Sequence, residues 1–186
     1  MSEEESGPID AENYSVRSLI KDLDSEDMLS YLRKFPRDLE NWLVRENYED
    51  FSWTNKIVSR AWKGIICLGM GGSAAGGMFL SSLANQNGSH PVYVWNKYGL
   101  PHWWDPEWLV IASSYSGNTE ETLDGVEKAL AEGGTVVAIT SGGILTGICE
   151  VNDNANIIHV EAGQPPRSAF GKIFGAMLSF CWHVGL

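Results

Sequence analysis

The sequence predicts an α/β protein built on a three-layer, doubly wound, five-stranded parallel sheet, with an N-terminal helical extension. Two observations carry this prediction. Short continuous apolar runs alternate with helical stretches over residues 64–184, and the loops that follow several of these runs are rich in glycine and hydroxyl side chains. Continuous apolar strands are typical of sheets buried on both faces, and their alternation with helices indicates βαβ units.

The chain begins with a segment that lies outside the predicted sheet. Residues 1–8 are expected to be a disordered acidic tail, and residues 9–50 to form two helices that pack on the core. Apolar residues at spacings of three and four support the helices, and Pro36 is expected at a helix break or start. The α/β domain then occupies residues 51–186.

Five apolar runs are the expected strands: 64–69, 92–95, 108–113, 135–140 and 156–160. Four helical stretches are expected near 74–87, 119–132, 143–150 and 168–184. Five strands in this order favour a flavodoxin-like sheet. In such a sheet ligands bind at the carboxyl ends of the strands, near the point where the strand order reverses.

The composition excludes several classes of function. The chain is 44% hydrophobic, but no run of about 18 apolar residues would span a membrane, and the acidic N-terminus does not resemble a signal peptide. A net charge of -11 argues against nucleic acid, whose phosphates require a basic face. Residues 1–50 hold 14 of the 24 acidic side chains, so the remaining domain is only mildly acidic and remains compatible with a small anionic ligand.

Cysteines and histidines give no sign of a metal site or a disulfide framework. Cys67, Cys149 and Cys181 are odd in number and far apart, so they are expected to be buried, reduced thiols of a cytoplasmic protein. The four histidines show no metal-ligand spacing. No cofactor is expected.

The loop after the first strand, in LGMGGSAAGG, is rich in glycine. Gly71 and Gly72 allow close approach of the backbone to a ligand, and Ser73 is expected to cap the following helix. A glycine-rich packing turn is the simpler interpretation. A dinucleotide fingerprint is a third, but the second strand ends at Trp95 with no carboxylate for a ribose, and a Walker lysine is missing as well.

The loop after the third strand, SSYSGNTEETL, carries the more specific pattern. Ser114, Ser116, Thr119 and neighbouring polar residues crowd a strand-to-helix junction. Free N–H groups and the dipole of a helix start attract an anion, and hydroxyls donate to it without bringing a charge. The alternative is a helix cap by Asn118 or Thr119. Capping needs one oxygen and this loop offers several, so we favour anion binding.

Two further loops are expected at the same edge of the sheet. The residues 140–143, TSGG, lie either beside the site or in a plain turn. Arg167 follows Pro165-Pro166 after the fifth strand, and a surface role and a functional role are equally compatible with it. The aromatic connection over 94–108 favours a buried plug or a subunit contact over a sugar-stacking surface.

Taken in order, GMGGSAAGG, SSYSGNTEET, AITSGG and PPRSAFG resemble the sugar isomerase (SIS) domain, over roughly residues 10–186. Within that superfamily the chain is most similar to the N-terminal half of the bifunctional phosphoglucose/phosphomannose isomerases. The resemblance implies a phosphosugar ligand. It implies that Ser114, Ser116 and Thr119 hold the phosphate, that Gly72 and Ser73 contact the sugar, and that Arg167 stabilises negative charge on the reacting oxygens.

The resemblance also implies an aldose–ketose isomerase that interconverts glucose 6-phosphate or mannose 6-phosphate with fructose 6-phosphate, or the N-terminal domain of one. The glutamate base and the histidine of the family belong to a second SIS domain or a neighbouring subunit, and Glu161 and His183 do not match them by motif. A truncated gene product, a split enzyme and a stand-alone binding module therefore stay open. The alternative function is a non-catalytic sugar-phosphate sensor or assembly module. A homodimer, or pairing with a second SIS domain, is expected.

Overall fold

The computed structural model describes residues 15–44 and 52–186. The predicted acidic tail lies outside the described residues, as do parts of the segment predicted to be helical over 9–50. Residues 15–44 contain three helices where two were expected over 9–50: α1 (Val16–Leu23), α2 (Met28–Arg33) and α3 (Phe35–Leu43). A short helix, α4 (Thr54–Val58), leads into the sheet. No helix of the described parts is long and apolar enough to cross a membrane.

Five parallel strands form one sheet, in the order β2-β1-β3-β4-β5. They are β1 (Gly64–Leu68), β2 (Val92–Trp95), β3 (Trp108–Ser113), β4 (Thr135–Thr140) and β5 (Ala155–His159). The helices of the α/β domain are α5 (Gly71–Asn87), α6 (Glu120–Ala131), α7 (Gly143–Glu150) and α8 (Phe170–Val184), with a short 3-10 turn η2 (Pro166–Ser168) before α8. The predicted fold class and all five strands are confirmed, with shifts of one residue at β1 and β5.

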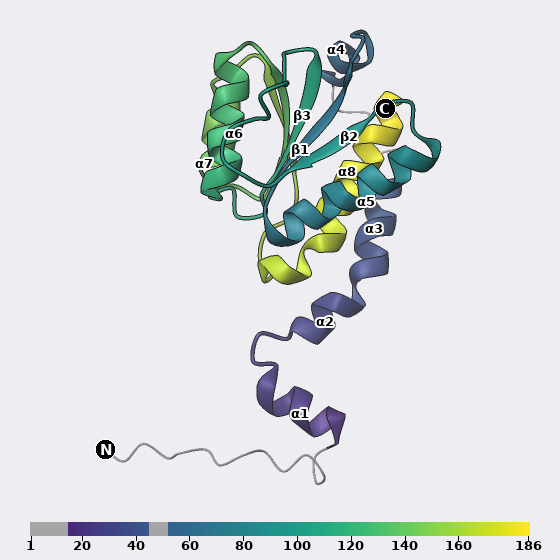
Figure 1. Ribbon diagram of the computed structural model, residues 1–186. Coiled ribbons are helices and arrows are strands. Elements are labelled where there is room, and N and C mark those ends of the chain that lie inside the picture. The colour runs from purple at the N-terminus through teal and green to yellow at the C-terminus, as the bar shows by residue number, and fades with distance from the viewer. Residues whose placement is uncertain (1–14, 45–51) are drawn as a thin grey trace, which may run out of the picture.

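The strands are buried on both faces because their apolar side chains alternate between two cores. In β1, Ile65 and Cys67 belong to the core beneath α5 and α8, whereas Ile66 and Leu68 belong to the core beneath α6 and α7. Figure 1 shows these two helix pairs on opposite sides of the sheet. Complete burial of an aliphatic side chain stabilises a fold by about 1.5–3 kcal/mol, so the two cores account for the unbroken apolar runs.

All three cysteines are buried free thiols, as expected from the sequence. Burial raises the pKa of Cys67 to about 12 and that of Cys149 to about 11 because the protein interior disfavours the thiolate. These side chains therefore act as small apolar residues of the core.

Helix α3 is attached to the domain through a groove on α8. Gly171 and Gly175, one helical turn apart, leave room for Phe35 and Trp42 of α3, and a Cβ at Gly175 would lie 3.1 Å from Trp42. The ring of Phe35 also stacks on Phe170 at a centroid distance of 5.8 Å. In contrast, α1 and α2 extend away from the sheet (Figure 1).

We expect Gly175→Leu to destabilise the protein by about 1–3 kcal/mol, because the added side chain would displace Trp42 from the groove. Chemical denaturation followed by tryptophan fluorescence measures the change. Gly147→Leu is the matched control, since Gly147 lies in α7 with open space around it. Equal stability of the two variants would show that α3 does not depend on this groove.

Candidate functional site

The candidate site lies at the carboxyl edge of the central strands. After β1 the chain passes to α5 on one face of the sheet, and after β3 it passes to α6 on the other. The strand order reverses between these two strands, which is where doubly wound sheets leave a crevice for ligands. The Ser113 hydroxyl donates to the carbonyl oxygen of Ser73 at 3.1 Å and so joins the two loops.

The loop of residues 114–119 has an unusual backbone that depends on glycine. Gly117 has a φ of +67°, and a Cβ at this position would overlap the carbonyl group of Gly142. Gly143, at a φ of +77°, meets the carbonyl oxygen of Ser116 in the same way. The loops after β3 and β4 therefore pack backbone against backbone.

Hydrogen bonds reinforce this contact between the two loops. The carbonyl oxygen of Tyr115 accepts from the Ser141 hydroxyl at 2.6 Å and from the Ser141 amide at 3.1 Å. The Leu145 amide donates to the carbonyl oxygen of Gly117 at 2.9 Å. Residues 140–143 therefore support the 114–119 loop and are more than a plain turn, which was one of the two interpretations that the sequence left open.

The alternative interpretation, a side-chain cap of α6 by Asn118 or Thr119, is not what the structure contains. The amide oxygen of Asn118 accepts from the Ile144 amide at 3.0 Å, in the first turn of α7. Thr119 stands at the N-cap position, but no side chain caps α6, and its hydroxyl pairs with that of Ser114 at 2.9 Å. The first amides of a helix have no acceptor within the helix, so those of α6 remain available to a ligand.

Ser114 and Thr119 share one hydrogen bond but carry two hydroxyl hydrogens. The Gly117 amide donates to the Ser114 oxygen at 3.1 Å, and the pair keeps one hydroxyl hydrogen free to donate. Ser116 is exposed, and its hydroxyl oxygen accepts from the Asn118 amide at 3.3 Å. The three hydroxyls of the loop therefore present donors without a full positive charge.

The first loop supplies a second helix start. Helix α5 begins at Gly71, so Ser73 lies inside its first turn and does not cap it, contrary to expectation. The helix starts earlier because Gly71 adopts a φ of +53° that lets the chain turn directly into it. Gly72 is exposed, with open space where a Cβ would be.

Arg167 lies in η2, at the end of the segment that follows β5. Its side chain is exposed and has no hydrogen bond or ion pair with the residues that the structure describes. The guanidinium is therefore free to meet an anion. Ser168, the next residue, is buried and donates its hydroxyl to the carbonyl oxygen of Pro165 at 2.8 Å, which fixes the turn.

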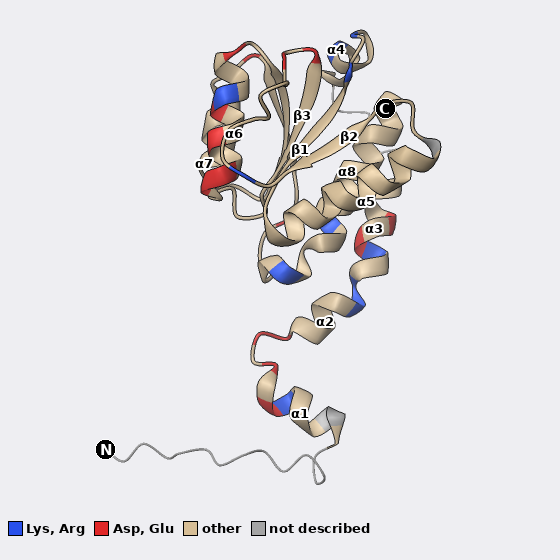
Figure 2. Ribbon diagram, viewed as in Figure 1, with Lys and Arg blue, Asp and Glu red and all other residues tan. Residues whose placement is uncertain are grey.

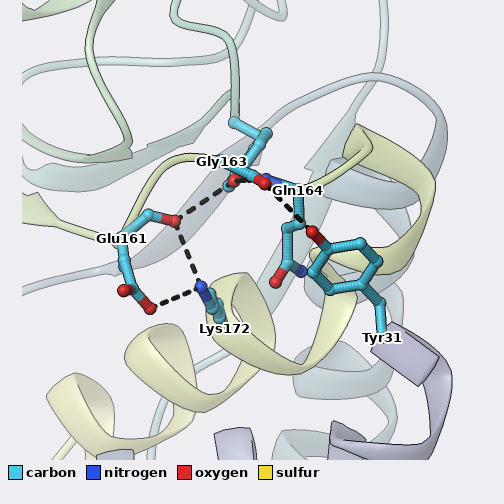
Figure 3. Close-up of polar contacts among 6 residues, drawn as sticks. Tyr31, Glu161, Gly163, Gln164 and Lys172 are labelled. Atoms are coloured by element: carbon cyan, nitrogen blue, oxygen red, sulfur yellow. Dashed lines mark hydrogen bonds and ion pairs between the residues drawn. The ribbon is translucent and has the colours of Figure 1, made fainter. Parts of the chain in front are cut away.

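Sequence reasoning missed the residues that hold the segment over 161–164. Lys172, whose side chain is only 11% exposed, forms an ion pair with Glu161 at 2.9 Å (Figure 3). A hydrogen bond from Lys172 lowers the pKa of Glu161 below its ordinary value, and the ion pair attaches this carboxylate to α8. The sequence does contain a signal for this role, because Lys172 is a single lysine in an otherwise apolar helix.

His183 and the aromatic connection over 94–108 lie outside the loops described above. His183 lies in the last turn of α8, at the end of the helix that points away from η2 and the carboxyl edge of the sheet. In the aromatic connection, Trp104 is buried as a plug, whereas Trp103 is 50% exposed and packs edge-on against Tyr93 and Trp108. In the described parts of the chain, no three potential metal ligands gather.

These loops and this sheet can be compared with known proteins. The SIS domain profile matches residues 60–184. The chain belongs to the SIS domain family. All the loops described above fall within the matched residues of this SIS domain.

Two relatives are similar to this chain in sequence. A bifunctional phosphoglucose/phosphomannose isomerase of Caldicellulosiruptor bescii is 42% identical over 122 residues, which cover 66% of this chain and 36% of the relative. A protein of the same name from Aquifex aeolicus is 36% identical over 139 residues, which cover 74% of this chain and 43% of the relative. The SIS domain chain therefore spans less than half the length of these relatives.

Solved structures share the fold at low sequence identity. The tagatose-6-phosphate ketose/aldose isomerase of Escherichia coli superimposes with a TM-score of 0.61 and 21% identity, covering 85% of this chain and 46% of that one. The C-terminal domain of glucosamine-fructose-6-phosphate aminotransferase from Francisella tularensis superimposes with a TM-score of 0.63 and 18% identity, covering 89% of this chain and 49% of that one. These likenesses establish the SIS architecture alone.

We expect Gly117→Ala to destabilise the SIS domain by clearly more than Gly133→Ala. Both glycines have a positive φ, so both substitutions cost about 1–2 kcal/mol of backbone strain, but only Gly117 meets a neighbouring backbone. Urea denaturation measures the two free energies of unfolding. Equal losses would mean that the loops after β3 and β4 separate without cost.

Proposed function

We propose that this chain is the phosphosugar-binding SIS domain of an aldose–ketose isomerase that interconverts glucose 6-phosphate or mannose 6-phosphate with fructose 6-phosphate. The observation that carries the proposal is the convergence of uncharged donors on one uncapped helix start. The Ser114–Thr119 pair, the Ser116 hydroxyl and the first amides of α6 lie together there. The names of the relatives in C. bescii and A. aeolicus support the choice of reaction.

Each residue has a separate role in this proposal. Ser114, Ser116 and Thr119 bind the phosphate, whose binding energy positions the rest of the sugar. Gly72 and Ser73 contact the sugar from the start of α5. Arg167 meets the oxygens at the other end of the substrate, where negative charge develops.

The reaction moves one proton between neighbouring carbons. A base removes the proton from the hydroxyl-bearing carbon next to the aldehyde, which gives an enediolate. The proton is then delivered to the former aldehyde carbon, and the hydroxyl proton passes from the second oxygen to the first, which gives the ketose. The Arg167 guanidinium stabilises the enediolate oxygens. Glu161 is paired with Lys172 and His183 lies at the far end of α8, so we assign the base to a residue outside this domain.

A non-catalytic sugar-phosphate sensor or assembly module is the alternative. Both proposals predict that fructose 6-phosphate raises the stability of the chain, by about 2.7 kcal/mol at a concentration 100 times Kd. They differ in turnover. Binding without isomerisation, even when the chain is combined with a second SIS domain, would favour the module.

We expect Ser116→Ala to weaken fructose 6-phosphate binding roughly 10- to 100-fold, since hydrogen bonds to charged groups contribute about 1.5–3 kcal/mol.

Arg167→Ala should lower kcat of the complete isomerase by about 10²–10³, because it removes a charge that acts on the reacting oxygens. Calorimetry and a coupled isomerase assay measure the two effects.

Ser82→Ala on α5 and Arg37→Ala on α3 are matched controls, since both residues are exposed and outside the site. Circular dichroism checks that all four variants remain folded. Wild-type activity in Ser116→Ala and Arg167→Ala would remove the site assignment.

We also propose that the domain pairs through α5 and α8, either with a second copy or with a second SIS domain. Helix α5 contains no charged residue along its 17 residues. In Figure 2 it carries neither red nor blue, whereas α6 carries both. Its outer face leaves large apolar side chains exposed: Met78 at 53%, Phe79 at 56% and Leu83 at 43%, beside Trp182 of α8 at 86%. Leu83 and Trp182 line one hollow of about 300 Å³. Exposed apolar patches of this kind mark interfaces.

Leu83→Glu is expected to convert a dimer of this chain to a monomer in sedimentation velocity, because it places a charge in the proposed interface. Ile144→Glu is the control, since Ile144 is 59% exposed on α7, across the sheet. A monomeric wild-type chain would exclude the homodimer and leave the second SIS domain. Dimerisation of Leu83→Glu would place the interface elsewhere.

We also propose that this chain is located in the cytoplasm. The three buried free thiols support it, since such thiols persist in a reducing compartment.

A further inference from the structure

Tyr115 connects two parts of the site that the sheet keeps apart. It lies between Ser114 and Ser116 in the loop after β3, while Arg167 follows β5, and β4 stands between these strands. The Tyr115 side chain is 7% exposed. Its hydroxyl donates to the carbonyl oxygen of Glu161 at 3.1 Å and accepts from the Gln164 amide at 3.2 Å.

The segment over 161–164 has few other attachments. Lys172 donates to the carbonyl oxygen of Glu161 at 3.3 Å, and the Tyr31 hydroxyl donates to that of Gly163 at 3.2 Å (Figure 3). These two side chains attach the segment to α8 and α2. Of the described residues, Tyr115 is the one that attaches it by a side-chain hydrogen bond to the 114–119 loop.

The chain between this attachment and Arg167 is short and stiff. Two prolines, Pro165 and Pro166, follow Gln164 directly and fix their own φ angles. The Ser168 amide and hydroxyl both donate to the carbonyl oxygen of Pro165, at 2.9 and 2.8 Å. A displacement of Gln164 is therefore passed on to Arg167.

We propose that Tyr115 is a positioning residue that sets the distance between the phosphate-binding loop and the Arg167 guanidinium. This inference rests on the proposed function of both groups. It predicts a specific pattern: loss of the Tyr115 hydroxyl should weaken contacts at the reacting end of the ligand and spare those at the phosphate. A hydroxyl that only stabilised the fold would affect both ends alike.

Two probes separate the two ends. Inorganic phosphate occupies the 114–119 loop alone. A five-carbon aldonic acid with a terminal phosphate reaches further, because its carboxylate takes the place of the enediolate oxygens beside Arg167. Calorimetry on the 186-residue chain gives Kd for both probes.

We expect Tyr115→Phe to bind inorganic phosphate within twofold of the wild type and the phosphorylated acid about tenfold more weakly. The double variant Tyr115→Phe/Arg167→Ala should bind the acid no more weakly than Arg167→Ala alone, since the hydroxyl acts through the arginine. Tyr31→Phe is the matched control, because it removes the other tyrosine hydroxyl on this segment, and it should leave both affinities within twofold.

Pro166→Gly provides a second test if Tyr115→Phe folds poorly. Pro166 is exposed, and glycine there frees the stiff connection while Tyr115 stays in place, so the same selective loss is expected. Equal effects on both probes, additive losses in the double variant, or equal losses from Tyr31→Phe would overturn the role of Tyr115. A wild-type chain that binds neither probe would overturn the proposed function itself, and this inference with it.

Discussion

The backbone contact between the loops after β3 and β4 is the constraint on which the rest of the site depends. Gly117 and Gly143 have positive φ angles and leave no room for a Cβ. The two loops therefore pack with the backbone of each glycine against a carbonyl group of the other loop. That contact directs Asn118 toward the first turn of α7. With Asn118 occupied there and Thr119 paired with Ser114, α6 keeps an uncapped start. The availability of these helix amides is thus a consequence of packing between loops.

The chemistry of the site follows from which charges are free and which are engaged. The 114–119 loop offers hydroxyls and amides, which bind an anion without the desolvation cost of a buried cation. Lys172 is engaged with Glu161, whereas Arg167 has no partner in the described parts of the chain. In the proposed function, an uncharged phosphate-binding loop and a separate, unpaired guanidinium would allow tight binding at one end of a substrate and charge stabilisation at the other.

The sheet was predictable in detail because its signal is local. The apolar runs that became β2, β3 and β4 agree with the structure to the residue, since burial on both faces demands uninterrupted apolar sequence. The hydroxyl-rich loop and Arg167 were likewise visible as polar residues at strand ends. The caps were not, because whether Asn118 serves α6 or α7 depends on a hydrogen bond with Ile144, 26 positions away. Tyr115 was missed for a similar reason, since its hydroxyl contacts backbone atoms 46 and 49 positions away. Lys172 pairs with Glu161, 11 positions earlier, and no sequence pattern links the two residues.

The uncharged surface of α5 also has a consequence for how two molecules meet. The chain carries a net charge of -11, so copies repel one another at a distance. The repulsion is weakest when α5 of one copy approaches α5 of another, since that helix contributes no charge. Approach by α6, with acidic residues in its first turn, is disfavoured. The uneven distribution of charge therefore favours some orientations of two copies over others during their encounter.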